Sequence, residues 1–196
     1  MVLDIAKEAI SSIDTHSINF DDLKAGKANI KVFGVGGAGN NMVTWLFNKG
    51  INGATVYAAN TDALHLSITK ADDKILIGKE LTRGLGAGGK SEIGREAAKE
   101  SVSELKKAAS GADMIFVLGG EGGGTGTGAM PVIAQIAKET GAVVIGVVTM
   151  PFECEKARID KAEFGLQELR DQVDTVIVID NNRLVDIAGQ LPIQQA

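Results

Sequence analysis

Residues 118–128 (LGGEGGGTGTG) have the composition best suited to bind phosphate in this sequence. Seven of these eleven residues are glycine, and Thr125 and Thr127 add hydroxyl donors. The segment follows an apolar run at 114–118 that predicts a buried strand, and it precedes a helical pattern at 128–138. A glycine-rich turn between strand and helix exposes backbone N–H groups at the positive end of the helix, where phosphate binds. The patterned flanks favour this interpretation over a flexible loop.

A second glycine turn, residues 34–41 (GVGGAGNN), follows another predicted strand. Gly34, Gly36 and Gly39 fit the G-x-G-x-x-G dinucleotide fingerprint. That fingerprint also needs an acidic residue at the end of the next strand, where this sequence has Asn60, and Asp62 comes slightly late. A nicotinamide dinucleotide site therefore stays open but is not favoured.

A third turn, residues 83–91 (RGLGAGGKS), leads into a long predicted helix. Gly88 and Gly89 have N–H groups that would close over a terminal phosphate, whereas the alternative is a plain helix cap at Ser91. Three such turns exceed what a diphosphate needs and fit a nucleoside triphosphate. The sequence has no G-x-x-x-x-G-K-[ST] motif, which excludes a P-loop enzyme, and Lys90 is interpreted as solvated.

Three charged residues outside the turns are further candidates. Asp62 has the chemistry to hold Mg²⁺ together with phosphate oxygens, and it is also suited to cap a helix at 63–67. Glu155 and Arg158 are placed to bind a ribose hydroxyl and a phosphate or base. A surface pair at the start of a helix explains their spacing equally well.

Composition narrows the function classes. The 196 residues carry a net charge of -5, which argues against a general nucleic-acid binder. One cysteine excludes an intrachain disulfide and a cysteine-based metal site, and two histidines exclude a histidine-rich metal site. We see no apolar stretch long enough to cross a bilayer and no targeting signal, so we expect a cytoplasmic protein without membrane insertion.

Strand and helix patterns alternate from residue 29 onward, which predicts an α/β, doubly wound (Rossmann-like), mostly parallel six-stranded sheet with helices on both faces. The glycine turns at 34–41 and 118–128 follow the first and fourth strands, which are neighbours at the switch point of such a sheet. The predicted strands lie at 30–35, 55–59, 74–77, 114–118, 143–148 and 175–179. The predicted helices lie at 41–48, 91–109, 128–138 and 158–172.

The two ends of the chain differ from this pattern. Residues 1–28 have a helical stripe and predict an N-terminal arm packed outside the domain, with partner docking as the alternative. Near the other end, Gly189 is suited to close a short helix at 184–188. Residues 191–196 then resemble a helix that stops after about one turn, so we expect a truncated chain.

The motifs together resemble the FtsZ and tubulin family of GTPases, and archaeal-type FtsZ above all. The GGGTGTG segment at 122–128 is the most specific match. Supporting segments are 34–41, Asn60-Thr61-Asp62, 84–88 (GLGAG), Thr149 with Pro151-Phe152, and 180–184 (DNNRL). The resemblance covers residues 29–196, which would be a GTP-binding domain that ends at the start of the family's central helix.

The resemblance implies a site for GTP or GDP with Mg²⁺. The first turn would line the α- and β-phosphates, the 122–128 loop would hold the phosphates from the other side, and the third turn would approach the γ-phosphate. Asp62 would lie near the metal, Glu155 would meet the ribose, and Arg158 would meet the nucleotide's outer edge. The cofactor-binding residues implied are Gly36, Gly37, Ala38, Gly39, Asn40, Asn41, Gly88, Gly89, Gly123, Gly124, Thr125, Gly126, Thr127, Glu155 and Arg158.

The sequence departs from the family pattern in three places. Glu121 stands where an apolar residue usually precedes the signature loop, and we expect its carboxylate to point away from phosphate. The spacing from Glu155 to Arg158 is one residue short. The chain ends before the base-reading residues of the central helix and before the second domain, whose acidic loop positions the attacking water. We therefore assign no catalytic residue here and expect weak or no turnover by this chain alone.

The implied function is that of a cytoskeletal GTPase that polymerises head-to-tail for cell division, with itself and other division proteins as partners. A role in cell shape stays open within this class. The alternatives from other classes are a NAD(P)-binding domain of an oxidoreductase and a non-enzymatic module that caps filament ends.

Overall fold

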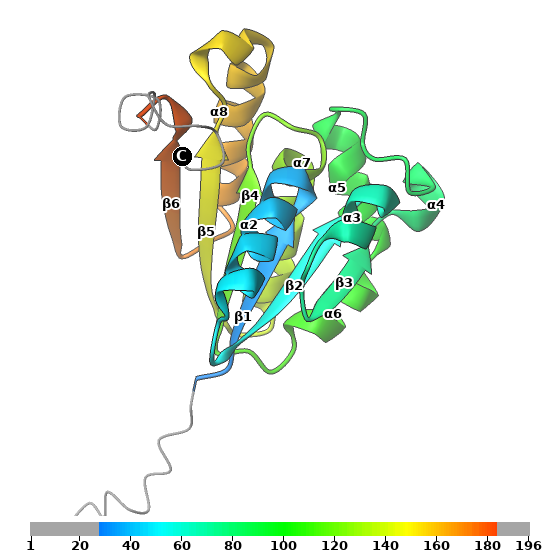
Figure 1. The fold of residues 1–196 in the computed structure, drawn as a ribbon, viewed down its shortest axis with the longest axis vertical. Helices are drawn as coiled ribbons and strands as arrows, with labels where there is room; N and C mark the ends of the chain where they lie inside the picture. The colour runs from blue at the N-terminus through cyan, green and yellow to red at the C-terminus, as the bar shows by residue number, and fades with distance from the viewer. Residues whose placement is uncertain (1–27, 184–196) are drawn as a thin grey trace, which may run out of the picture.

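The computed structural model describes residues 28–183, which form one sheet with helices on both faces (Figure 1). The predicted N-terminal arm at 1–28, apart from Ala28, lies outside the described residues. So do the predicted helix at 184–188 and the helix start at 191–196.

The sheet confirms the predicted doubly wound architecture. Its strand order is β3-β2-β1-β4-β5-β6, and every pairing is parallel. Each strand lies within two residues of its predicted bounds. The strands are β1 (Ile30–Val35), β2 (Ala54–Asn60), β3 (Asp73–Leu76), β4 (Met114–Gly120), β5 (Val143–Met150) and β6 (Thr175–Asp180).

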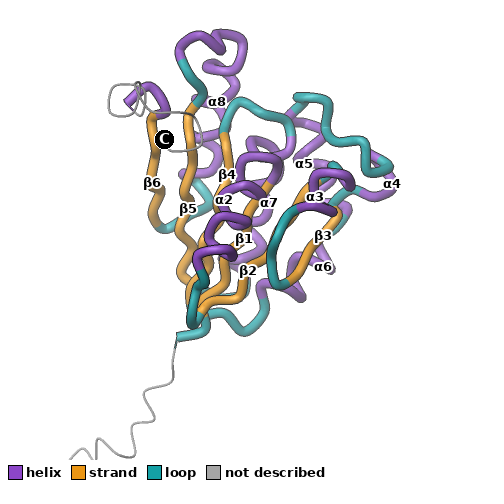
Figure 2. Tube along the Cα trace, in the orientation of Figure 1, coloured by secondary structure: helices purple, strands orange, loops and turns teal. Residues whose placement is uncertain are grey.

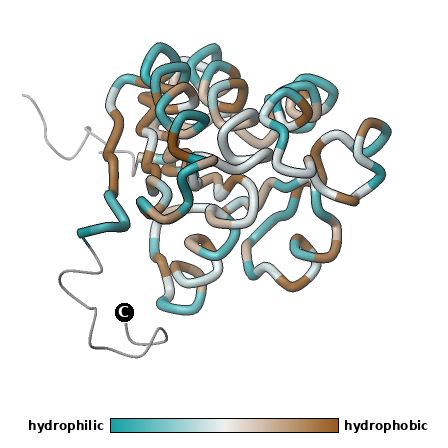
Figure 3. The backbone as a smooth tube through the Cα atoms, turned by 90° about the horizontal axis from the view of Figure 1, so that it is seen from above, coloured by the Kyte–Doolittle hydropathy of each residue, from teal (hydrophilic) through white to brown (hydrophobic). Residues whose placement is uncertain are grey.

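Two layers of helices cover the sheet, as the view from above shows (Figure 3). Along β1, Val32 packs with Val43 of helix α2 on one face, whereas Phe33 and Val35 join the larger core on the other face. This alternation is the period of two that a strand requires when both of its faces are buried. The helices are α2 (Gly36–Lys49), α3 (Ala63–Ile68), α4 (Lys79–Thr82), α5 (Ser91–Glu100), α6 (Val102–Ala109), α7 (Thr125–Glu139) and α8 (Lys156–Arg170), with a short 3-10 turn, η1 (Glu153–Glu155).

The helices differ from the prediction in where they begin. Helices α2, α7 and α8 start at residues 36, 125 and 156 rather than 41, 128 and 158, so the first two begin inside the glycine turns. The helix predicted over 91–109 is two helices, because the chain breaks at Ser101. The hydroxyl oxygen of Ser101 accepts a hydrogen bond of 3.0 Å from the Gly78 N–H, which ties the break to the start of α4.

The switch point lies between β1 and β4. Helix α2 leaves β1 over one face, and α7 leaves β4 over the other, so both helices begin at the carboxyl edge of the sheet (Figure 2). Glycine permits this close start: a Cβ on Gly39 would overlap the Leu118 carbonyl oxygen, and one on Gly126 would overlap the Gly120 carbonyl oxygen. The backbone of both turns is thereby held against the strand ends.

Candidate nucleotide-phosphate site

A cleft of about 320 Å³ lies at this carboxyl edge. Eight of the predicted site residues line it together. Gly37 and Ala38 come from the first turn, and Gly123, Gly124, Thr125 and Gly126 come from the signature loop. Glu155 and Arg158 come from the segment after β5. The sequence therefore located residues on three separate elements that the fold brings to one place.

Two helix N-termini face this cleft without capping side chains. Helix α2 begins after Val35 and helix α7 after Gly124, and neither helix has a side-chain cap or an acidic residue in its first turn. The first N–H groups of a helix have no intrahelical partner, so an uncapped end leaves donors for a ligand. With the positive end of each helix dipole, these donors make an anion site that needs no basic side chain.

Asn40 fixes the first turn from beneath. Its side chain is fully buried. With the amide oriented to satisfy both ends, it donates to the carbonyl oxygens of Gly34 (3.0 Å) and Gly36 (3.2 Å) and accepts from Asn60 Nδ2 (2.9 Å). Asn40 therefore holds the turn in place instead of reaching into the cleft, whereas Asn41 is exposed on α2.

The other turns pack against the signature loop. Thr61 Oγ1 and Thr125 Oγ1 lie 2.7 Å apart in a hydrogen bond, which joins the segment after β2 to the start of α7. A Cβ on Gly124 would come within 3.1 Å of the Gly89 carbonyl carbon. Gly88 and Gly89 are exposed at this edge, beside the cleft rather than in its lining. The three turns are thus neighbours at one edge of the sheet.

Asp62 has the capping role that its position predicted. One carboxylate oxygen accepts a hydrogen bond of 3.0 Å from the His65 N–H at the start of α3. The expected alternative cap at Ser91 is absent, since α5 begins after Lys90 without a side-chain cap, and Lys90 is exposed. Within residues 28–183, no group of three acidic, histidine or cysteine side chains is arranged to hold a metal. A cation near Asp62 would therefore take most of its ligands from phosphate and water.

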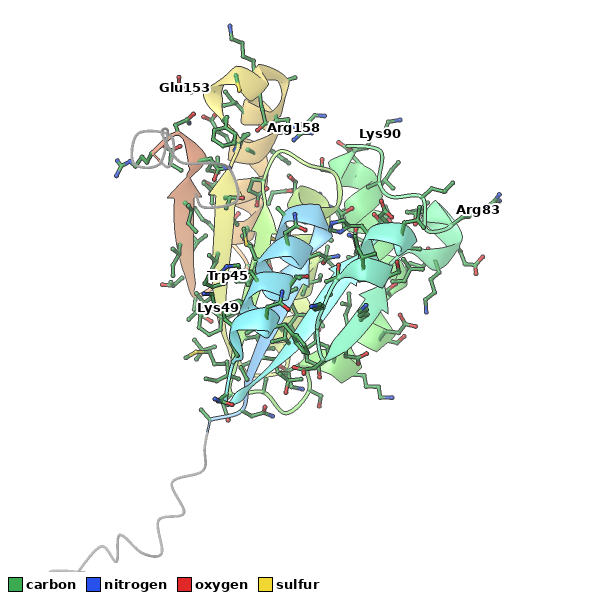
Figure 4. All side chains as sticks on the ribbon, viewed as in Figure 1. Trp45, Lys49, Arg83, Lys90, Glu153 and Arg158 are labelled. Atoms are coloured by element: carbon green, nitrogen blue, oxygen red, sulfur yellow. The ribbon has the colours of Figure 1, made fainter. Side chains whose placement is uncertain are left out.

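Glu155 and Arg158 bind each other at the mouth of the cleft. Arg158 Nη1 donates to Glu155 Oε1 at 2.8 Å, and the other Glu155 oxygen accepts from the Phe152 N–H at 3.1 Å. Figure 4 places Arg158 and Lys90 at the same edge, on opposite sides of the loop between β4 and α7. The geometry is compatible with both interpretations of Glu155 and Arg158, as nucleotide-binding residues and as a surface pair, because they stand at a helix start and also line the cleft.

The Glu121 carboxyl is buried between α7 and α8. Glu121 is only 5 % exposed, and its carboxyl lies against Thr127 and against Gly165 of α8. Burial raises the pKa of this carboxyl to about 7, with the Thr127 hydroxyl opposing the shift and the Glu168 carboxylate adding to it. Thr127 is itself 1 % exposed and lies behind the loop.

Several lining residues were not among the predicted site residues. They are Val35, Gly120, Glu121, Thr149, Met150, Pro151 and Asn181. Most of them stand at or just after the carboxyl end of a strand, which is the positional signal that identifies them once the strand order is known. Asn181 follows β6, so every strand from β4 to β6 contributes to the cleft.

The fold and the cleft define a class: a doubly wound domain with two uncapped helix N-termini at a cleft beside its switch point. A family model described as "Tubulin/FtsZ family, GTPase domain" matches residues 29–189. The chain belongs to this family. No helix among the described residues is both long and apolar enough to cross a bilayer.

Similar proteins include archaeal FtsZ. "Cell division protein FtsZ 2" of Methanocaldococcus jannaschii is 50% identical over 196 residues, and "Cell division protein FtsZ 1" of Pyrococcus abyssi is 58% identical over 171 residues. These alignments cover 100% and 87% of this chain but 51% and 46% of the relatives. The chain therefore spans about half the length of the relatives it matches.

Solved structures give the same result. "FtsZ dimer, empty (M. jannaschii)" superposes with a TM-score of 0.84 at 52% identity, covering 90% of this chain and 52% of that one. "CetZ2 from Haloferax volcanii - GTPgS bound protofilament" superposes with a TM-score of 0.71 at 26% identity, covering 79% and 49%.

Proposed function

We propose that this chain binds GTP and GDP in the cleft at the β1–β4 switch point, as the nucleotide-binding part of an FtsZ-like GTPase. The observation that carries the proposal is the convergence of two uncapped helix N-termini, α2 and α7, on one cleft. The family match favours a guanine nucleotide over NAD(P), and the relative described as a GTPgS-bound protofilament supports a triphosphate.

The proposed contacts follow the positions in the cleft. Backbone N–H groups of the first turn of α2, at Gly36, Gly37 and Ala38, and those from Gly123 to Thr127 bind the α- and β-phosphates. Gly88 and Gly89 approach the γ-phosphate. Arg158 and Glu155 exchange their mutual ion pair for contacts with the nucleotide's outer edge and ribose.

We propose that Asp62 lies near a bound Mg²⁺ ion. One of its carboxylate oxygens is committed to the cap of α3, and the carboxylate is half-buried beside the third turn. When bound, the metal would neutralise charge on the phosphates. Asp62 itself caps α3, and it lies next to the third turn, since a Cβ built on Gly86 would be 3.8 Å from the Asp62 Cβ.

We also propose that the chain associates with itself head-to-tail and that GTP is hydrolysed only where a neighbouring subunit is present. Relatives are named as a dimer and as a protofilament, and others as cell division proteins. A heterologous contact of this kind generates filaments when it does not close. We propose that the protein acts in the cytoplasm, in a filament for cell division, with a role in cell shape as the alternative.

A titration of this chain with GDP, GTP, ATP and NADH, each with and without Mg²⁺, tests the nucleotide-binding proposal. Saturable binding of the guanine nucleotides, stronger than that of NADH, is the expected result. Equal binding of GTP and ATP would retain the phosphate site but remove base recognition from residues 28–183. Binding of NADH alone would overturn the proposal.

A further inference from the structure

Glu121 is buried immediately before the loop that lines the candidate phosphate site. Its N–H donates to the Thr149 carbonyl oxygen at 3.0 Å, which fixes the backbone at the junction of β4 and the loop. Its side chain is 95 % removed from solvent. Within residues 28–183, both of its carboxyl oxygens and the Thr127 hydroxyl lack a hydrogen bond of normal geometry, so the nearby hydroxyl only partly opposes the effect of burial on the pKa. An ionised carboxylate in that position would be costly, because burial without partners strongly disfavours charge.

The space for this carboxyl comes from a glycine in α8. A Cβ on Gly165 would overlap a Glu121 carboxyl oxygen and the Thr127 methyl carbon. The carboxyl therefore lies between α7 and α8, in contact with the first turn of α7. A larger residue at 165 would fill the volume that Glu121 occupies, so the cavity and the carboxyl fit each other.

The surroundings offer Glu121 no compensating cation. On α8, the facing charge is Glu168, a second carboxylate, which is paired with Arg95 of α5. Arg158 is also on α8, and its Cβ lies beside Gly122 of the loop after β4. Its guanidinium group is paired with Glu155. Among the described residues, α7 contributes the neutral Thr127 next to Glu121, and β5 contributes the Thr149 carbonyl group. The electrostatic environment thus favours the neutral acid.

The neutral acid and a bound phosphate are compatible, whereas the carboxylate and a phosphate are not. Helix α7 has no acidic residue in its first turn, so its positive end is left to a ligand. An ionised Glu121 beside Thr127 would use the same dipole and would repel phosphate across the loop. Phosphate in the cleft would in turn hold the proton on Glu121 more firmly.

We propose that Glu121 is a proton-linked positioning residue of the phosphate loop: the site binds nucleotide with the Glu121 carboxyl neutral, and loss of that proton weakens binding. This inference rests on the proposed nucleotide-binding function. The proton comes from solvent and is taken up when nucleotide binds at a pH where the free site is ionised.

GDP binding by this chain, measured from pH 6 to pH 8.5, tests the inference. If bound phosphate raises the pKa of Glu121 from about 7 by one unit, affinity falls about fivefold between pH 6 and pH 8. The phosphate of GDP also titrates, near pH 6, and Glu121→Gln gives that baseline because glutamine is neutral throughout. We expect wild type to lose about fivefold more affinity than Glu121→Gln over this range.

Two controls make the test specific. Glu163→Gln removes an exposed carboxylate from α8 and should keep the wild-type pH profile. Glu168→Gln removes the neighbouring carboxylate that raises the pKa of Glu121, so the loss of affinity should move to lower pH. Calorimetry of GDP binding at pH 7.5 in two buffers of different ionisation enthalpy should show proton uptake by wild type in excess of that by Glu121→Gln.

The outcomes separate the two proposals. Parallel pH profiles and equal proton uptake for wild type and Glu121→Gln, with GDP bound by both, would overturn the linkage and leave nucleotide binding intact. No GDP binding by either protein at any pH would overturn nucleotide binding, and the linkage with it. If Glu121→Gln does not fold, the carboxyl signal of Glu121 in wild type, followed by NMR with and without GDP, decides the question: an unchanged midpoint refutes the linkage.

Discussion

Replacement of Glu121 by glutamine should make this chain more stable at alkaline pH than the native sequence. The ordinary pKa of the carboxyl is 4.5, and burial raises it to about 7 in the folded protein. Between these values the folded chain keeps a proton that the unfolded chain releases. The stabilising effect of that proton is complete below pH 4.5 and is lost as the pH rises through 7.

The size of the effect follows from the shift. A difference of about 2.5 pKa units, at 1.36 kcal/mol each, corresponds to about 3 kcal/mol of unfolding free energy. Glutamine has nearly the same shape and no charge, so Glu121→Gln escapes this loss. We expect the two proteins to be similar at pH 4.5, and the variant to lead by about 3 kcal/mol at pH 8.

Urea unfolding in the absence of nucleotide, followed by circular dichroism at half-unit steps from pH 4.5 to 8.5, measures the difference directly. Glu163→Gln serves as the matched control, because that carboxylate is exposed and should leave the pH dependence unchanged. A constant difference between wild type and Glu121→Gln across the range would refute the reasoning. So would a variant less stable than wild type at pH 8, since that would mean the carboxylate is stabilised by partners.

Three further perturbations test the fold and the site. Gly128→Ala should cost about 2–4 kcal/mol in urea unfolding, because its Cβ would overlap the Ser91 carbonyl oxygen where α5 crosses α7, whereas Gly37→Ala meets nothing within 4 Å and should leave stability unchanged. Gly123→Asp, compared with the uncharged Gly123→Asn, should weaken GDP binding about 10- to 100-fold by like-charge repulsion, and equal affinities would argue against phosphate at this position. Asp62→Ala should remove the α3 cap and lower the free energy of unfolding by about 1 kcal/mol. Asp62→Asn should keep the cap and lose only the Mg²⁺ dependence of GTP binding. If GTP binding by Asp62→Asn depends on Mg²⁺ as much as that of wild type, Asp62 has no role in holding the metal.

The strands were predictable because each is a short aliphatic run bounded by turn residues, and sheets of this kind bury both faces. The helix starts were not. Glycine has low helix propensity, so the pattern places the start of α2 at Asn41, but the chain is already helical at Gly36. Contacts made possible by the missing Cβ of Gly39 and Gly126 override propensity there. The Gly39 contact joins it to Leu118, about 80 positions away in sequence, which no local pattern reports.

The same limit applies to the site. Residue types predicted which loops would bind phosphate, but they gave Asn40 and Thr127 the same role as their neighbours. The structure separates them: Asn40 holds the first turn from below, and Thr127 lies behind the signature loop. The break at Ser101 escaped prediction for a related reason, since its cause is a hydrogen bond to Gly78, which precedes it by 23 residues.

A cradle made of backbone dipoles has a consequence for charge. Helix N-termini supply only fractional positive charge, about half an elementary charge each. One full negative charge buried beside such a site is therefore comparable to the summed partial positive charge of the two helix N-termini that attracts the ligand. A site built on lysine or arginine would tolerate a neighbouring carboxylate by pairing with it, whereas Glu121 has no such partner among the described residues. The protonation of one buried acid should for this reason change the affinity of the site, and the pH dependence of binding is where that change should be visible.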